Sequence, residues 1–174
     1  STGDIYLLGS GFGTWNIGSV TVPNVGGVTV LIALDSVGDT KWVETLQGNN
    51  SYADQVEIDN AGNVYLSGRF LTSLIVGPDT LTKYDTTQVN YTPYIAKFDT
   101  AGAYQWSKAF KMGAYSNPLY TASSGKNIPF GINSNGTLFV GVNFKDRVVF
   151  DSDTIISSYP FSEDFLMVRM SALG

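Results

Sequence analysis

The sequence contains neither cysteine nor histidine in its 174 residues. The absence of cysteine excludes disulfides and thiolate chemistry. The absence of histidine excludes His-based triads, zinc sites of the usual histidine-containing kinds and the commonest general base near neutral pH. Pairs of carboxylates remain as a means of acid–base catalysis. We therefore expect a protein that is not an enzyme and that needs no cofactor.

The sequence is also poor in charge and in long apolar runs. Charged residues make up 14% of the chain, and 15 acidic residues against 10 basic ones give a formal net charge of −5. Such a chain has no basic patch to neutralise phosphates, so we expect no nucleic-acid partner. No apolar run approaches the roughly 18 residues of a membrane-spanning helix, and no signal peptide opens the chain. We therefore expect no membrane span.

Glycine and aromatic residues are what the chain has in quantity. It contains 19 glycines, and aromatic residues reach 13% within a hydrophobic fraction of 43%. Glycines placed between aromatic and β-branched runs predict many short strands. At this length the chain can form one domain with a substantial core.

One pattern recurs along the chain: an Asp or Asn with a Gly three residues later, between two strand-like runs. In one register the turn leads into a segment like VYLSG, and in a second register it is followed by tryptophan. In the last copy of the second register, Ser171 stands in the place of Asp. The matching segments are 1–12, 54–70 and 128–144 in the first register, and 31–46, 94–110 and 165–174 in the second.

The repeated turn has a conformational explanation. A short Asp or Asn side chain accepts hydrogen bonds from the backbone ahead of it, and Gly supplies the positive φ that a tight hairpin loop needs. The acidic residue varies to Asn and Ser whereas Gly is kept, so we interpret the turns as structural. The positions are Asp35, Asp59, Asp99 and Asn133, with Gly38, Gly62, Gly102 and Gly136.

The strands on either side of these turns carry apolar residues on both faces. Val64 and Leu66 alternate with Tyr65, for example, so both faces of the sheet need a covering layer. The order of strands and turns predicts units of four antiparallel strands stacked face to face. A connection with Thr21, Thr80 or Thr154 at the matching place predicts a small extra hairpin in each unit.

Four-stranded units stacked by apolar faces form the blades of a β-propeller. The whole pattern is D-x-x-G-N-V-Y-x-x-G, a long connection, then aliphatic-A-K-aromatic-D-x-x-G and a Trp. It resembles the SBBP-type β-propeller repeats, most strongly over Val56–Phe110. The resemblance implies a secreted or cell-surface protein of Bacteroidota, of the kind exported by type IX secretion. Ser171, Pro129 and Gly131 depart from the family pattern.

The strand count divides the chain into three parts. Residues 1–48 form a partial blade of three strands, residues 49–126 a complete blade with an inserted loop at 111–126, and residues 127–174 another partial blade of three strands. About two and a half blades do not close a propeller, so we expect a segment of a larger one. The remaining blades of the same polypeptide, or further copies of the chain, would cover the apolar end faces.

We expect a non-catalytic propeller module that serves adhesion, scaffolding or protein–protein interaction. One alternative is a carbohydrate-binding, lectin-like propeller. Another is the propeller part of a secreted enzyme whose catalytic residues lie outside this segment.

Aromatic side chains outside the core strands are the candidates for contact with glycans or surface proteins, because rings stack on sugars and anchor interfaces. Trp42 and Trp106 occupy equivalent repeat positions, which favours packing between blades. The candidates are Trp15, Tyr84, Tyr91, Tyr115, Tyr120 and Tyr159.

Three groups of carboxylates are candidates for chemical sites. Asp151 with Asp153 could offer oxygens to calcium, but a calcium loop needs more ligands at set spacings, so we favour a solvated hairpin. Glu57 shares its strand face with Asp59, which the turn engages, and Glu163-Asp164 reads as a polar loop before a strand. We expect no catalytic or metal site.

The family resemblance also implies O-glycosylation, which in secreted Bacteroidota proteins falls on Asp-Ser/Thr followed by a small apolar residue or Thr. Two of the five matching triplets lie in the repeated turns, where backbone geometry also explains them. Thr80 and Thr154, on the extra hairpins, are the preferred sites. The candidates are Ser36, Thr80, Thr86, Thr100 and Thr154.

Overall fold

The computed structural model describes residues 3–22, 28–48, 50–83, 91–112, 129–158 and 164–174. Within these ranges every element of regular secondary structure is a β-strand. None of the described segments is a helix that could cross a membrane. The strands form several antiparallel sheets, none of which closes on itself. The prediction of an all-β protein is therefore confirmed.

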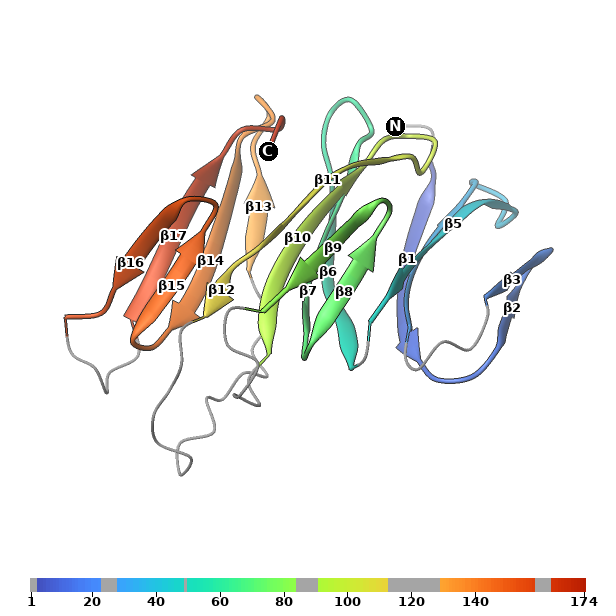
Figure 1. The fold of residues 1–174 in the computed structure, drawn as a ribbon. Helices are drawn as coiled ribbons and strands as arrows, with labels where there is room; N and C mark the ends of the chain where they lie inside the picture. The colour runs from blue at the N-terminus through green and yellow to red at the C-terminus, as the bar shows by residue number, and fades with distance from the viewer. Residues whose placement is uncertain (1–2, 23–27, 49, 84–90, 113–128, 159–163) are drawn as a thin grey trace.

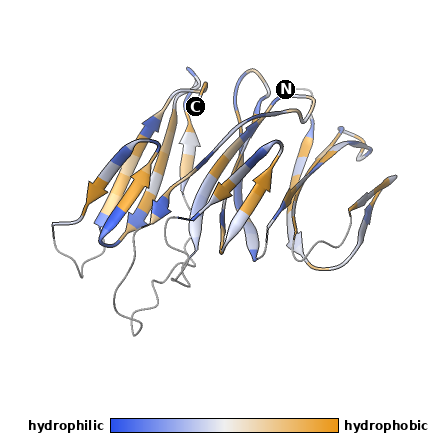
Figure 2. Ribbon diagram, in the orientation of Figure 1, coloured by the Kyte–Doolittle hydropathy of each residue, from blue (hydrophilic) through white to orange (hydrophobic). Residues whose placement is uncertain are grey.

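Three sheets follow one another along the chain and lie side by side, from the N-terminal one at the right of Figure 1 to the C-terminal one at the left. We call them the first, second and third units. Hydrophobic residues, orange in Figure 2, occur on the strands of all three. In sheet order, the first unit contains β1 (Ile5–Gly11), β4 (Val28–Leu34) and β5 (Thr40–Gln47); the second contains β6 (Ser51–Ile58), β7 (Val64–Phe70), β10 (Thr92–Phe98) and β11 (Tyr104–Ala109); the third contains β13 (Phe130–Ile132), β14 (Leu138–Phe144) and β17 (Asp164–Met170).

An extra hairpin follows the equivalent strand of each unit, as the connection pattern predicted. In the second unit the hairpin also pairs with the outer strand of the unit before it, through Gln47 on β5 and Ile75 on β8. The third unit's hairpin does the same through β12, which continues the second unit beyond β11. The hairpins are β2 (Trp15–Ile17) with β3 (Val20–Val22), β8 (Ser73–Val76) with β9 (Asp79–Thr82), and β15 (Arg147–Phe150) with β16 (Asp153–Ile156).

The inserted loop expected at residues 111–126 begins differently from the prediction. Lys111 and Met112 form the short strand β12, whose partners are Val149 and Val148 of β15. This pairing gives hydrogen-bond partners to backbone groups that would lack them in a loop. The comparison of repeats did not predict it because only two residues of β12 take part. Residues 113–126 lie outside the described part of the chain.

The repeated turns have the predicted geometry. In the turn after β4, Asp35 Oδ1 accepts hydrogen bonds from the backbone N–H groups of Val37 and Asp39, each at 2.9 Å. Gly38 follows with a φ of 94°. Asp59, Asp99 and Asn133 accept the same pair of hydrogen bonds in their own turns.

The sheet of each unit has two faces, and the pairing register of the strands shows which face of one unit is equivalent to which face of another. We call the face that carries Val64 and Leu66 in the second unit the leading face, and the face that carries Tyr65 and Ile95 the trailing face. The leading face of the second unit packs against the first unit, where Leu31 and Leu46 join the same buried cluster. Leu74 and Val76 of the second unit's hairpin close this core.

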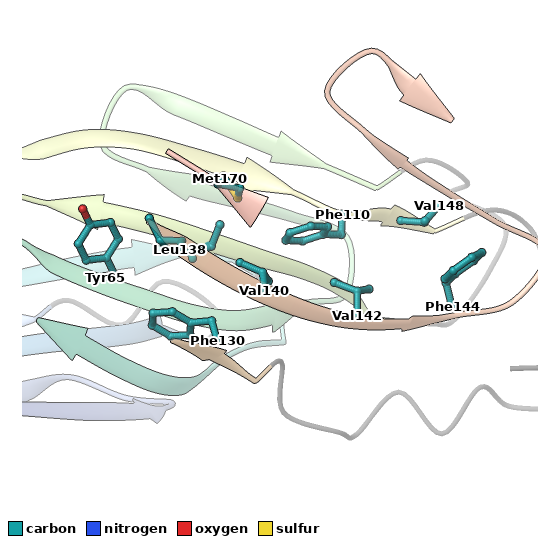
Figure 3. Close-up of a cluster of buried hydrophobic side chains, with 10 residues drawn as sticks. Tyr65, Phe110, Phe130, Leu138, Val140, Val142, Phe144, Val148 and Met170 are labelled. Atoms are coloured by element: carbon teal, nitrogen blue, oxygen red, sulfur yellow. The ribbon is translucent and has the colours of Figure 1, made fainter. Parts of the chain in front are cut away.

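The second core lies between the second and third units. Tyr65 and Ile95 of the second unit meet Leu138 and Val140 of the third, and all four side chains are fully buried. Figure 3 shows this cluster, with Phe110 and Val148 also turned into it. Apolar residues on both faces of the second unit are thus explained by a covering unit on each side.

Tryptophan and glycine join the units in the same way at both interfaces. Trp42 Nε1 donates to the carbonyl oxygen of Thr100, and Trp106 Nε1 donates to that of Ala172, each at 3.2 Å. Each indole also lies against the glycine of the same turn, Gly102 or Gly174. The packing role predicted for Trp42 and Trp106 is confirmed. These contacts explain why a tryptophan recurs at the same distance after the turn glycine in both units.

Candidate ligand site at the edge of the second unit

Two tyrosines and an arginine meet at one edge of the second unit. Tyr52 on β6 is the register partner of Arg69 on β7, and Tyr91 precedes β10. The guanidinium carbon of Arg69 lies 5.2 Å from the centre of the Tyr52 ring and 5.8 Å from that of the Tyr91 ring. The two rings contact each other edge to face, with centroids 5.7 Å apart. The guanidinium therefore lies within cation–π distance of both rings.

A buried carboxylate completes the cluster. Asp54 lies where the pairing of β6 with β7 shifts register between Ala53 and Gln55, and its Oδ1 accepts a hydrogen bond from Arg69 Nη1 at 2.5 Å. The side chain is 5% exposed, and its Oδ2 has no hydrogen-bond partner in the described part of the chain. Burial raises the pKa of Asp54, and the attraction to Arg69 only partly offsets this effect. The ion pair with this buried carboxylate fixes the position of the Arg69 guanidinium.

A hollow of about 180 Å³ adjoins the cluster, with Tyr52 common to both. Phe12, which is 67% exposed, stands on the wall from the first unit. Hydroxyl groups are fixed nearby: Thr29 Oγ1 lies 3.4 Å from Ser10 Oγ and 3.3 Å from Ser51 Oγ. The hollow is lined by Ser10, Gly11, Phe12, Asn50, Ser51 and Tyr52.

The hollow and the adjoining cluster combine apolar and polar surface. The rings of Phe12 and Tyr52 offer apolar surface, and Ser10, Asn50 and Arg69 offer hydrogen-bonding groups beside it. A small ligand with an apolar face and several hydroxyl groups, such as a sugar ring, combines these two properties.

Comparison with known proteins gives no independent indication of the ligand. No model of a known protein family matches the sequence, and no curated protein matches it. The interpretation of the cluster therefore depends on its own geometry.

The six predicted aromatic candidates have different positions. Tyr91 belongs to the cluster with Tyr52 and Arg69. Trp15 lies instead against Gly9 and Gly11 of β1 and is half-buried, a position typical of a packing residue. The other four lie outside the described residues: Tyr84, Tyr115, Tyr120 and Tyr159.

The candidate carboxylates that the structure describes do not gather into one site. Asp151 adopts a positive φ of 52° in the turn between β15 and β16 and accepts a hydrogen bond from Lys108 Nζ at 2.8 Å. Glu57 accepts one from Gln55, and Asp164 opens β17. The described residues contain no group of three or more acidic, Cys or His side chains that could hold a metal ion. Glu163 lies outside them.

The candidate glycosylation sites are reachable where the structure describes them. Thr80 on β9 and Thr154 on β16 are exposed on the extra hairpins. Ser36 and Thr100 are exposed in the repeated turns. The carbonyl oxygen of Thr100 also accepts the hydrogen bond from Trp42 Nε1. Thr86 lies outside the described residues.

Three members of the cluster, Tyr52, Asp54 and Arg69, were not singled out in the sequence. A signal was present, because Arg69 is the only charged residue of β7 and the neighbouring strand β6 carries the acidic Asp54. Strand alternation did not place them together, because the register shift beside Asp54 breaks the alternation.

Proposed function

We propose that this chain is a run of β-propeller blades acting as a non-catalytic binding module of a secreted or cell-surface protein. The observation that carries the proposal is the repeated interface: the first and second units each present a tryptophan to a turn glycine of the next unit. Both interfaces use the same hydrogen bond, from Trp42 to Thr100 and from Trp106 to Ala172. Radial repetition of four-stranded sheets with one conserved contact is typical of propeller blades.

The assignment to SBBP-type repeats, to Bacteroidota and to type IX secretion depends on the sequence resemblance. Exposed Thr80 and Thr154 agree with it, because a surface hairpin accommodates a bulky glycan at little cost in packing. Mass spectrometry of protein from its native source is expected to find an O-linked sugar on one or both threonines. Unmodified sites in native material would argue against this source.

Proximity labelling on intact cells tests the binding module. With a labelling enzyme fused to this protein in the cells that make it, we expect the labelled neighbours to be secreted or surface proteins. Labelling confined to cytoplasmic proteins would overturn the proposal.

A second candidate function is carbohydrate binding, and the cluster around Arg69 favours it. Tyr52 and Tyr91 present rings for the apolar face of a sugar, while Arg69, which Asp54 holds in place, offers hydrogen bonds to hydroxyl groups. Net charge of −5 makes a neutral sugar a better ligand than an acidic one.

Glycan-array binding followed by titration calorimetry tests this candidate. We expect Tyr52→Ala to reduce binding of a neutral glycan at least tenfold. Phe165→Ala, which removes an exposed ring from the third unit, is the matched control and is expected to leave binding unchanged. Equal losses in both variants, or no binding to any glycan, would exclude the site.

A further inference from the structure

The turn between β13 and β14 differs from the other repeated turns in the residue that precedes its glycine. Three turns of the first and second units carry Val37, Ala61 and Ala101 at this place, whereas the third unit carries Asn135 before Gly136. This is the only Asn-Gly pair in the sequence. Asparagine is a chemically labile residue, so this turn has a reactive amide where the other three have hydrocarbon.

The tip of this turn is open to solvent. Asn135 is exposed, and Gly136 has a positive φ of 74° and no side chain to shield its backbone nitrogen. Ala61, at the equivalent place in the second unit, is exposed although the third unit packs against the second. A further unit packed on the third would therefore leave Asn135 exposed as well.

From these observations we infer that Asn135 is a site of spontaneous deamidation, with water as the only co-reactant. The backbone nitrogen of Gly136 loses its proton and attacks Cγ of Asn135. The bond between Cγ and Nδ2 breaks, and the released nitrogen takes up that proton and leaves as ammonia. Water then opens the resulting succinimide ring at one of its two carbonyl carbons. One opening gives aspartate, and the other gives isoaspartate, in which the main chain runs through Cβ.

The hydrogen bonds of the turn determine when this reaction starts. The backbone N–H of Gly136 donates to the carbonyl oxygen of Asn133 at 3.0 Å, so the attacking nitrogen is engaged while the turn is closed. Exposed turns open locally at a small cost in free energy, and each opening frees this nitrogen. The reaction is therefore faster at alkaline pH, where the nitrogen loses its proton more readily, and slower in the folded chain than in the unfolded one.

The isoaspartate product disturbs the turn that touches the second unit. The backbone N–H groups of Asn135 and Thr137 donate to Asn133 Oδ1 at 3.0 and 2.9 Å. Isoaspartate inserts one more carbon into the main chain between these two N–H groups, which moves them apart. In the same turn, the carbonyl oxygen of Ser134 accepts a hydrogen bond from Asn60 Nδ2 of the second unit at 3.2 Å. Deamidation therefore adds a negative charge and weakens the turn that makes this contact between units.

Peptide mass spectrometry of the full chain, incubated at pH 8.5 in water enriched in oxygen-18, tests the inference. We expect label to enter position 135 with time, as a mixture of aspartate and isoaspartate, and at least tenfold more slowly at pH 6. Asn60 is the internal control, because it is also exposed but is followed by Ala61. We expect its labelling to be at least tenfold slower than that of Asn135. Asn135→Ala introduces the residue that two other turns carry, so it is expected to fold and to lose the label.

Hydrogen exchange on the incubated chain measures the structural consequence. We expect the Thr137 amide to lose protection in the isoaspartate form, whereas the Asn63 amide, which Asp59 holds in the equivalent turn, keeps it. The chain unfolded in urea is the positive control for the chemistry. If Asn135 reacts there but stays unmodified in the folded chain, the inference is overturned, as it is if the label persists in Asn135→Ala. The inference does not depend on ligand binding near Arg69, so it can fail while the proposed function holds.

Discussion

The two ends of the stack of units differ in how much apolar surface they expose. At the leading end, Val30 and Ile32 of β4 are 0% and 9% exposed, because Trp15, Ile17 and Val22 of the first hairpin pack against them. At the trailing end, Phe165 and Met167 of β17 are 57% and 63% exposed.

The difference follows from where each hairpin lies. A hairpin packs on the leading face of its own unit, as Leu74 and Val76 also do in the second unit. The first unit therefore carries a partial cover for its leading face even with no unit before it in the described structure. The trailing face depends on the unit that follows. Of the two ends, the trailing end leaves the apolar side chains of its middle strand more exposed.

The largest expected effect comes from truncating the same repeat position inside the stack and at its trailing end. Ile95→Ala removes a fully buried side chain between two units and is expected to lower the free energy of unfolding by about 2–5 kcal/mol. Met167→Ala, at the exposed equivalent position, is expected to change it by less than about 0.5 kcal/mol. Chemical denaturation of both variants measures the contrast, and equal losses would mean that the second and third units do not pack together in solution.

A smaller effect is expected from uncovering the leading end. Trp15→Ala removes the ring that lies on Gly9 and Gly11, so more of the leading face is exposed to solvent. We expect a loss of about 2 kcal/mol, below the range for a fully buried Trp because Trp15 is half-buried. Binding of a hydrophobic dye should rise as well. Unchanged dye binding would show that the hairpin does not protect this face.

Much of this architecture was predictable because it depends on local rules. An Asx residue and a positive-φ Gly define each turn, as Asp59 and Gly62 illustrate, and alternation defines the strands between them. Apolar residues on both faces correctly indicated stacked sheets. The tryptophan positions 42 and 106 were interpreted correctly for the same reason, since repeat equivalence implies an equivalent environment.

The candidate ligand site could not be predicted from these local rules. Asp54 and Arg69 meet through a register shift, which no alternation pattern reports. The pairing of β12 with β15 joins segments of different units through two residue pairs, too few to leave a periodic signal. Only Tyr91 of the cluster was anticipated, because an aromatic residue outside the core strands is conspicuous by its type alone.

Two glycines at the same repeat position differ in their surroundings: one turn is in contact with a tryptophan ring and the other has no neighbour. Gly102 has a φ of 84° and lies under the ring of Trp42, with 2.7 Å between the position of an added Cβ and the nearest ring atom. Gly38 has a φ of 94° and no neighbour within 4 Å. Both alanine variants lose about 1–2 kcal/mol through backbone strain. We expect Gly102→Ala to lose about 1 kcal/mol more in thermal unfolding, owing to the clash with Trp42. Equal losses would mean that the indole does not seat on this turn.

The smallest effect concerns the charge of a turn residue. Burial would raise the pKa of Asp59, but hydrogen bonds from Asn63, Tyr65 and Ala61 together lower it below its ordinary value of 3.8. A carboxyl group with a lowered pKa in the folded state stabilises the protein above the pKa of the unfolded chain. That contribution is lost as the pH falls through the folded pKa.

Asp59→Asn separates the charge from the turn geometry, because Asn133 closes the equivalent turn of the third unit with the same two backbone hydrogen bonds. At pH 7 we expect a loss of about 1 kcal/mol, since the amide oxygen still accepts those bonds but the NH2 group replaces Oδ2, which accepts hydrogen bonds from Asn63 Nδ2 and the Tyr65 hydroxyl. Below pH 4 the difference between variant and parent should shrink, because the parent's carboxylate becomes protonated. Thermal unfolding between pH 2.5 and 7 tests this, and a difference that grows as the pH falls would contradict the lowered pKa of Asp59.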